Sequence, residues 1–380
     1  KIAVTFGPMC LAFRKSLSFV GHREDPRGLS GSEVGFIRIA QELKALGHDV
    51  TAYTVALETE YEGIKVRPLE AVPEIDSSFD AAISINEPDS LRDAHPKVKV
   101  VEFWLNEFNF CRPGFEQGID LFVSPSEPHR RYHLANEKPT ATSPQGVLGP
   151  MFRADPSNWE AIELGADVDR YPLTEKVPGR VVYCSSPDRG LHWLLQEWPT
   201  IKAAAPHATL KIFYRLQPWL AQFKTTKFYG PIESLRSRAL YIGECLDRLS
   251  APEWGITVCD SVSREQIERE MCLAEVLAYP VDTVSWSEGF SCTTIEACAA
   301  RACPVLWDTD AIGDIYRGAT SMHARGDIEG WRHGVIRALT DGDHRDQING
   351  CARTLAEKLT WKNHVQRLES SICRLVSKTA

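Results

Sequence analysis

The sequence predicts an α/β protein built from two Rossmann-like domains, each a parallel sheet covered by helices. Short apolar runs alternate with amphipathic stretches, which is typical of parallel strands joined by crossover helices. The alternation starts afresh near the middle of the chain. Its 380 residues suit two sheets of roughly 150 to 170 residues each better than one oversized sheet.

Ten apolar runs are predicted as strands. In the first half they are residues 2–6, 50–54, 81–85, 98–104 and 119–123, and in the second half 181–184, 210–214, 256–259, 276–279 and 304–307. The end of the chain is predicted as an amphipathic helix with Val365, Leu368, Ile372 and Leu375 on one face.

The stretch "ELGADVDRYPLTEKVPGR" is predicted as the linker between the domains, because it combines Gly, Pro and charged residues. The first domain is expected to span residues 1–172 and the second residues 173–361. The helix at about 362–380 is expected to pack back on the first domain.

Composition narrows the function class. No apolar run approaches the roughly 18 residues of a membrane span, and no charged and then apolar leader precedes the first strand. The eleven cysteines are scattered and never form Cys-x-x-Cys, so reduced thiols in a cytoplasm are expected rather than disulfides or a zinc site. A net charge of −8 argues against a surface that binds phosphate polymers throughout, although a local basic groove stays compatible with it.

A glycine-rich turn opens the first predicted helix. In "RGLSGSEVGFIRIAQELKALGHDV" the apolar residues recur at helical spacing, and the turn at Gly31, Ser32 and Glu33 lets backbone amides approach a ligand. The alternatives are that Ser32 caps the helix and that Glu33 interacts with its dipole. The spacing is not Gly-x-Gly-x-x-Gly, which disfavours a nicotinamide-dependent dehydrogenase.

Arg189 is predicted to lie where the loop after the strand at 181–184 turns into a helix. A guanidinium beside a helix N-terminus can bind a diphosphate, since its fixed donors add to the positive end of the helix dipole. The alternative is that Arg189 caps a nearby carbonyl or pairs with Asp188.

Two glutamates frame the start of a later helix in "SEGFSCTTIEACAARACPVLWD". Glu288 lies in the loop after the strand at 276–279, and Glu296 lies within the first turns of a helix that Ser291, Thr293 or Thr294 could cap. We expect both carboxylates to face one crevice and to accept hydrogen bonds from a polyhydroxylated ligand, while the amides of residues 290–292 and Arg189 hold its phosphates.

Three segments, taken in order, resemble the retaining nucleotide-sugar glycosyltransferases of the glycogen-synthase-like GT-B superfamily, family 4. They are "GSEVGFIRIAQELKALGHDVTAYT", "SSPDRGLHWLLQEWPTIKAAAPHATLKIFY" and "SEGFSCTTIEACAARACPVLWD". "LFVSPSEPHRRYHL" and "IELGADVDRYP" are similar to further segments of that family. The resemblance implies two Rossmann-like domains that face each other across a cleft, with the acceptor on the first domain and the donor on the second.

The resemblance also implies roles. Glu296 is expected to hold the ribose hydroxyls of the donor, and Glu288 to lie near the transferred sugar. Arg189 stands where the family usually has a lysine. The loop that touches the sugar and the phosphates matches Phe290, Ser291, Cys292 and Thr293. Gly31 and Ser32 match a turn that faces the donor phosphates, and Glu33 an acceptor residue.

The chain departs from the family pattern in two places. Ser185 and Ser186 replace the arginine that commonly precedes the lysine, so Arg215 is a candidate for the missing charge. Asn106 stands where a histidine is frequent, and His129 is the nearest substitute, with an ordinary surface position as the alternative. Both Asn106 and His129 are candidate acceptor residues.

The expected reaction is transfer of a hexose-type sugar from a nucleoside-diphosphate sugar to an acceptor hydroxyl, with retention and without a metal or other cofactor. The alternatives are a nucleotide-sugar epimerase and a catalytically degenerate sugar-nucleotide-binding protein. The acceptor is open: a glycan, a lipid-linked sugar, a small molecule or a modified nucleic acid. A peripheral membrane position is compatible with a basic loop that carries Arg14, Lys15, Arg23 and Arg27.

Overall fold

The computed structural model describes residues 1–7, 16–108, 111–140, 150–225 and 232–379. It divides into two compact units. Unit 1 comprises residues 1–23, 29–165 and 360–380, and unit 2 comprises residues 24–28 and 166–359. The C-terminal helix therefore belongs to unit 1, and the chain passes into unit 2 at residue 166, a few residues before the expected boundary at 172.

Unit 1 is built on an eight-stranded sheet with the order β10-β7-β6-β5-β1-β2-β4-β3, in which the one antiparallel pair is β3 with β4. The strands are β1 (Ile2–Phe6), β2 (Val50–Thr54), β3 (Thr59–Tyr61), β4 (Ile64–Pro68), β5 (Ala81–Ile85), β6 (Val98–Glu102), β7 (Leu121–Ser124) and β10 (Trp159–Ala161). A separate two-stranded ladder joins β8 (Lys138–Pro139) and β9 (Met151–Phe152).

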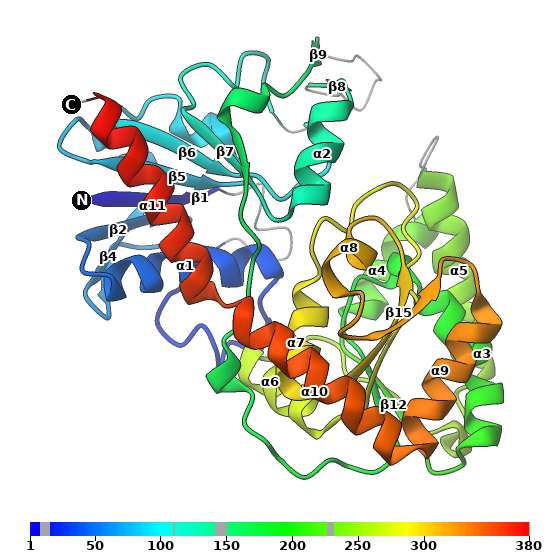
Figure 1. Cartoon of the computed structure of the whole chain (residues 1–380). Coiled ribbons are helices and arrows are strands. Elements are labelled where there is room, and N and C mark those ends of the chain that lie inside the picture. Colours follow the sequence, from blue (N-terminus) through cyan, green and yellow to red (C-terminus); the bar gives the residue numbers. More distant parts are fainter. Residues whose placement is uncertain (8–15, 109–110, 141–149, 226–231, 380) are drawn as a thin grey trace. The chain divides into compact units, whose positions relative to one another are not determined.

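The helices of unit 1 include α1 (Gly31–Ala45), α2 (Glu127–Ala135) and α11 (Trp361–Thr379), with short 3₁₀ turns η2 (Leu69–Glu74), η3 (Pro88–Leu91) and η4 (Pro156–Asn158). Helix α11 packs against α1 and β6 (Figure 1). Its apolar face carries Val365, Leu368 and Ile372, which are at most 3% exposed, as the sequence predicted.

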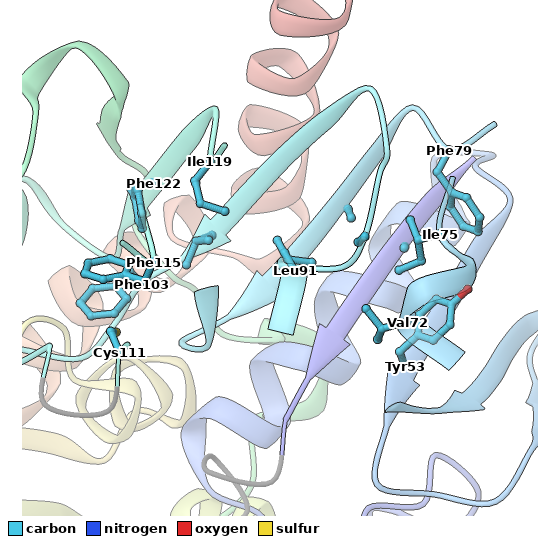
Figure 2. Packing of buried hydrophobic residues seen from close by; sticks show 14 of the residues in the cluster. Tyr53, Val72, Ile75, Phe79, Leu91, Phe103, Cys111, Phe115, Ile119 and Phe122 are labelled. Atoms are coloured by element: carbon cyan, nitrogen blue, oxygen red, sulfur yellow. The ribbon is translucent and has the colours of Figure 1, made fainter. Parts of the chain in front are cut away.

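Two opposite faces of the unit 1 sheet are covered. Phe6 of β1 stacks on Phe36 of α1 with ring centroids 5.2 Å apart. Because side chains alternate along a strand, Ala3 points to the other face. There it joins an aromatic-rich cluster that includes Phe103, Phe115 and Phe122, and Figure 2 shows this cluster with α11 behind the sheet. The sheet is thus buried on both sides, as parallel sheets usually are.

Unit 2 has a six-stranded parallel sheet with the order β13-β12-β11-β14-β15-β16. Its strands are β11 (Arg180–Tyr183), β12 (Thr209–Ile212), β13 (Ile256–Val258), β14 (Val276–Tyr279), β15 (Cys303–Asp308) and β16 (Ser321–Ala324). Its helices are α3 (Leu191–Ala204), α4 (Leu216–Thr225), α5 (Ile232–Arg248), α6 (Arg264–Leu273), α7 (Cys292–Ala300), α8 (Ile312–Tyr316), α9 (Ile328–Thr340) and α10 (Gly342–Lys358), with 3₁₀ turns η5 (Val168–Arg170), η6 (Pro187–Arg189) and η7 (Pro252–Trp254).

The prediction of two parallel α/β sheets is confirmed, and β1, β2, β5 and β14 begin and end at the predicted residues. The other predicted strands are shifted by one or two residues at one or both ends. The prediction missed β3, β4, β10 and β16, together with the β8 and β9 ladder. Among the described residues no helix is long and apolar enough to span a bilayer. The ten cysteines in the described ranges are free thiols, and Cys10 lies outside those ranges.

Candidate active site

The sheet of unit 2 has a topological switch point between β11 and β14. The strands that follow β11 along the chain, β12 and β13, lie on one side of it, and β15 and β16 lie on the far side of β14. Ligands of open α/β sheets bind at such a point, outside the carboxyl ends of the strands. The loop after β11 carries Arg189 and the loop after β14 carries Glu288, so the fold brings these two predicted residues to the same place.

Arg189 and Glu288 form an ion pair at this switch point. The Arg189 Nη1 donates to Glu288 Oε2 at 2.6 Å, and the Tyr279 hydroxyl donates to the same oxygen at 3.0 Å. The Ser185 hydroxyl donates to the Tyr279 oxygen at 2.9 Å. The Glu288 side chain is 5% exposed whereas that of Arg189 is 31% exposed, so the cation is the member of the pair that a ligand can reach.

The charges of this pair depend on each other. Burial raises the pKa of the Glu288 carboxyl, and Arg189 opposes that rise. The carboxylate in turn raises the pKa of the Arg189 guanidinium. Burial and the neighbouring Glu288 raise the pKa of the Tyr279 hydroxyl far above its ordinary range, so it stays a hydrogen-bond donor.

The alternative that Arg189 pairs with Asp188 is wrong. Asp188 accepts instead from the Ser186 hydroxyl, and its carbonyl accepts from Arg238 Nη1 at 2.7 Å. Arg238 of α5 also pairs with Asp282, which follows β14, at 2.9 Å. One guanidinium thereby fastens the loop after β11 to the loop after β14. The sequence gives no local signal for this role of Arg238, because it lies 50 residues from Asp188.

Gly190 explains why the β11 loop turns so sharply at Arg189. Gly190 is the N-cap of α3 with a φ of 112°, and a Cβ at this position would lie 2.0 Å from the Pro280 carbonyl oxygen. A side chain is therefore excluded on both conformational and steric grounds. This close approach keeps the loops after β11 and β14 against each other.

Asp310 positions the backbone of Glu288. Its Oδ2 accepts from the amides of Ser287 and Glu288, both at 2.9 Å, and from the Thr283 hydroxyl at 3.0 Å. Asp310 itself has a left-handed backbone with a φ of 54°. The sequence analysis did not single out Asp310, although an Asp-x-Asp spacing after a predicted strand was a signal that could have found it.

The start of α7 lies beside this pair. Ser291 is the N-cap and its hydroxyl accepts from the Thr294 amide at 3.2 Å, so of the three predicted caps Ser291 is the one used. The Thr293 hydroxyl donates to the Cys184 carbonyl at 2.8 Å, and Phe290 packs on Tyr316 with centroids 6.0 Å apart. These side chains hold the loop in place. The backbone amides of Cys292 and Thr293 lie in the first turn of α7 and have no acceptor within the helix, so they are the groups that can bind an anion.

Glu296 and Glu288 belong to separate ion pairs, and the expectation that both carboxylates face one crevice stays a prediction. Both Glu296 oxygens accept from Arg264 of α6, with Nη1 to Oε2 at 3.1 Å. Burial raises the pKa of Glu296, and Arg264 opposes the rise. Both carboxylates interact electrostatically with the Cys292 thiol. Burial raises the pKa of this thiol, the charges of Glu296 and Glu288 add to the rise, and the pKa reaches about 12. The two acidic networks thus lie near a common thiol at the start of α7.

Arg215 follows β12, the neighbour of β11 in the sheet, and is half-buried. Its charge lowers the pKa of Tyr214, as does that of Arg189, although burial raises that pKa overall. Arg215 therefore lies at the carboxyl edge of this sheet, and its role as the missing charge stays a prediction. In the basic loop, Arg14 and Lys15 lie outside the described residues, and Arg27 pairs with Asp25 at 2.7 Å.

Unit 1 has its own switch point between β1 and β5. Asn86, directly after β5, is 3% exposed and has a left-handed φ of 61°. Its Nδ2 donates to the Ser32 hydroxyl at 3.2 Å, and its Oδ1 accepts from the Trp104 amide at 2.7 Å. Asn86 was missed by the sequence analysis, although a polar residue directly after a buried strand was a usable signal.

The turn before α1 has a structural role. Ser30, not Ser32, is the N-cap, and Glu33 completes a capping box with it: the Ser30 amide donates to Glu33 Oε2 at 2.5 Å. The alternative that Ser32 caps the helix is therefore wrong. Gly31 is the first residue of α1, and the Ser32 hydroxyl is held by Asn86.

The predicted acceptor residues Asn106 and His129 belong to one buried polar cluster. His129 is 0% exposed, so the alternative of a surface position is wrong. Its Nε2 lies 3.1 Å from the Leu105 carbonyl and 3.2 Å from Nε2 of His133. The Asn106 carbonyl accepts from the Lys138 ammonium, whose pKa burial lowers to about 8. The cluster thus holds the loop after β6 through hydrogen bonds to the backbone carbonyls of Leu105 and Asn106.

Comparisons with known proteins place this fold. No family model and no curated protein matches the chain. Among solved structures, sucrose-phosphate synthase from Thermosynechococcus elongatus is similar with a TM-score of 0.66 and 11% identity over 100% of both chains. A glycosyltransferase involved in avilamycin A biosynthesis has a TM-score of 0.64 at 14% identity, covering 100% of this chain and 99% of its own. Anabaena HepE, solved in complex with UDP and glucose, has a TM-score of 0.63 at 11% identity, covering 98% of this chain and 100% of its own.

At sequence identities of 11 to 14%, the similarity to these solved structures establishes the fold of this chain. Its neighbours are glycosyltransferases with two Rossmann-like domains, so the chain has the GT-B fold that the sequence predicted.

Proposed function

We propose that the protein is a glycosyltransferase that moves a hexose from a nucleoside-diphosphate sugar to an acceptor hydroxyl with retention of the anomeric configuration. The observation that carries the proposal is the ion pair of Arg189 and Glu288 at the switch point of unit 2, with Arg189 the more exposed partner. The similar HepE structure holds UDP and glucose, which supports a sugar nucleotide as the ligand.

The donor would be held by three kinds of group. The ribose hydroxyls donate to the carboxylate of Glu296. The diphosphate accepts from Arg189 and from the amides of Cys292 and Thr293 at the start of α7, where the helix dipole favours an anion. Glu288, anchored by Asp310 and Tyr279, accepts from hydroxyls of the transferred sugar.

The chemistry follows from where charge develops. The bond between the anomeric carbon and the β-phosphate oxygen breaks, its electron pair goes to the phosphate, and the sugar becomes oxocarbenium-like. Arg189 and the α7 amides stabilise the phosphate charge, which in a poorly hydrated site is the largest contribution such groups make. The acceptor oxygen then bonds to the anomeric carbon from the face that the diphosphate leaves. Its proton passes to the departing phosphate, so the configuration is retained.

We further propose that Arg189 and the helix amides balance the diphosphate charge without a divalent cation. In that case turnover is unchanged when a chelator is added and the protein is dialysed. We also propose a cytoplasmic location, since the thiols of the described cysteines suit a reducing compartment.

The decisive experiment is a donor panel. Purified protein is titrated with UDP-, ADP-, GDP- and TDP-hexoses by calorimetry, and the same titration is repeated with Glu296→Ala. We expect one base to bind, and the variant to bind it at least tenfold more weakly, because ribose hydroxyl bonds to a carboxylate are lost. No binding of any of these compounds to the wild-type protein overturns the proposal.

Turnover separates the proposal from its alternatives. The donor that binds is incubated with acceptor mixtures, and the anomeric configuration of the product is determined by NMR. A product that forms from the donor alone indicates an epimerase. Tight binding with no product from glycan, lipid-linked and small-molecule acceptors indicates a sugar-nucleotide-binding protein.

A further inference from the structure

Arg264 occupies a position that is unfavourable for a cation. It is the first residue of α6, where the positive end of the helix dipole lies, and its side chain is 12% exposed. Burial lowers the pKa of its guanidinium, but Glu296, Tyr171 and Glu268 raise it well above its ordinary value. The charge of Arg264 is therefore sustained by the acidic groups around it.

These partners fix the guanidinium in one orientation. Nε donates to Glu268 Oε1 at 3.1 Å, Nη2 donates to the Tyr171 hydroxyl at 2.7 Å, and both terminal nitrogens donate to Glu296. Arg170 also lies near Glu268, with its Nη1 3.7 Å from the same Oε1. Because three partners hold the planar guanidinium, it keeps one orientation relative to Glu296.

The consequence for Glu296 is geometric. A carboxylate offers about four lone-pair sites, and Arg264 takes one on each oxygen. One acceptor site remains on each oxygen, on the outer edge of the carboxylate. These two sites point away from each other, so each can accept from one hydroxyl. Without Arg264 the carboxylate could rotate, and its burial would favour the protonated form, which accepts fewer hydrogen bonds.

We propose that Arg264, oriented by Glu268 and Tyr171, is a positioning residue that holds Glu296 ionised and aligned so that an outer acceptor site of its carboxylate meets a hydroxyl of the bound nucleotide. This inference rests on the proposed function, because the hydroxyl it assigns belongs to the ribose of the donor nucleotide. Three other titratable groups interact electrostatically with Glu296: Asp167 of the linker, Cys184 after β11, and Cys292 at the start of α7. Arg170 lies against Glu268, and Arg353 of α10 donates to the Ala299 carbonyl.

The test measures binding of UDP, ADP, GDP and TDP to Arg264→Lys between pH 5 and 9. Lysine keeps the positive charge but cannot donate to both Glu296 oxygens in the fixed geometry of a guanidinium. The affinity for the preferred nucleoside diphosphate should therefore fall about ten- to hundredfold. The pH at which binding is half-maximal should move upward, because a less well paired Glu296 is protonated at higher pH. With saturating donor, kcat should fall less than donor KM rises. Tyr171→Phe should weaken binding by a few fold.

Arg345→Lys is the matched control. Arg345 pairs with the buried Glu275 at 3.0 Å before the amino end of β14, and it should change neither affinity nor pH profile. If Arg264→Lys does not fold, the double variant Arg264→Gln/Glu296→Gln keeps a hydrogen-bonded but uncharged pair, and its binding profile should lose the Glu296 step.

The outcomes separate the two proposals. Failure of the wild-type protein to bind any nucleoside diphosphate overturns the proposed function. Wild-type binding with an unchanged affinity and pH profile in Arg264→Lys, or in the double variant, overturns the role of Arg264.

Discussion

The two units present their sheet edges in contrasting ways. At the switch point of unit 2 the side chains form ion pairs whose carboxylates are buried, Glu288 with Arg189 and, nearby, Glu296 with Arg264. At the switch point of unit 1 the bonds join uncharged groups: Asn86 to Ser32, and the Trp104 amide to Asn86. The two sheets share a topology of crossover helices but differ in the chemistry placed at their edges.

This difference teaches which unit suits which ligand. A diphosphate requires cations and amides, and unit 2 has both at one point. In unit 1 the polar groups around Asn86 are neutral and bond to one another, so they hold the loops after β5 and β6 to the start of α1. We therefore expect mutations in unit 2 to act mainly on donor chemistry, and mutations around Asn86 on stability and acceptor use.

The largest effect is expected from Arg189→Met. The variant loses the cation that stabilises the leaving phosphate and leaves Glu288 buried with fewer partners, so kcat should fall roughly 10² to 10³-fold. Steady-state kinetics with the donor identified by the panel measures it. Arg317→Met, which removes an exposed pair with Asp308 in the same unit, is the control and should leave kcat within twofold. Equal kinetics in both variants would remove Arg189 from the site.

A second large effect is expected from Gly190→Ala. The added Cβ meets the Pro280 carbonyl and imposes a left-handed backbone on alanine, so the free energy of unfolding should fall by about 3 kcal/mol or more. Gly243→Ala, in α5 with open space around its Cβ, should instead add roughly 0.5 to 1 kcal/mol. Urea titration compares them. A neutral Gly190→Ala would show that the contact between the two loops is dispensable.

A smaller effect is expected from Asn86→Gly in unit 1. Glycine tolerates the positive φ, so the change isolates the two side-chain hydrogen bonds, whose loss should cost about 1 to 3 kcal/mol. Glu62→Gly is the matched control, since Glu62 is exposed and has a φ of 52°. Acceptor KM should rise in Asn86→Gly while donor affinity stays constant. A change in donor affinity alone would contradict the contrast between the units.

The smallest effect on stability at neutral pH is expected from replacing the buried histidines of unit 1. This effect should grow as the pH falls. Burial lowers the pKa of His129 to about 3 and that of His133 to about 2. Because the folded-state pKa values lie below the unfolded value of about 6.5, the stability that the neutral rings contribute is present above pH 6.5 and is lost as pH falls towards 3.

Each histidine should contribute a slope of up to about 1.4 kcal/mol per pH unit below pH 6.5. His133→Phe removes one of the two buried histidines, so it should roughly halve the dependence of the urea midpoint on pH. Phenylalanine suits the site because the His133 ring packs among Phe103, Phe108 and Trp159. His333→Gln, an exposed change in α9, should leave the dependence as it is. An identical acid slope in His133→Phe would assign the acid sensitivity to other groups.

The strands differ in how well the sequence predicted them. The runs that became β1, β2, β5 and β14 are buried along their whole length, so their apolar character ends where the strand ends. By contrast β3, β10 and β16 have three or four residues that are largely half-buried or exposed. Edge strands of this kind carry little hydrophobic signal, because only part of their surface leaves water.

The site shows the same division. Arg189, Glu288 and Glu296 were identified from local patterns, each placed after a buried strand or at a helix start. Their partners Arg264, Tyr279 and Asp310 were not, since they come from other loops and helices and carry no local pattern of their own. The sequence also did not show that Glu288 and Glu296 pair with two different arginines, because spacing does not reveal which cation each carboxylate meets.

What the sequence by itself determined is the fold class, two parallel sheets with crossover helices, and the loops that carry the acidic and basic groups. The reason is that burial and helix boundaries are written in local hydrophobic periodicity and in turn residues. What only the tertiary structure decided is the pairing: which arginine neutralises which glutamate, and which residues hold the loops together. These depend on contacts between segments 20 to 100 residues apart, and a buried charge is stabilised by whichever partner the fold brings within hydrogen-bond distance.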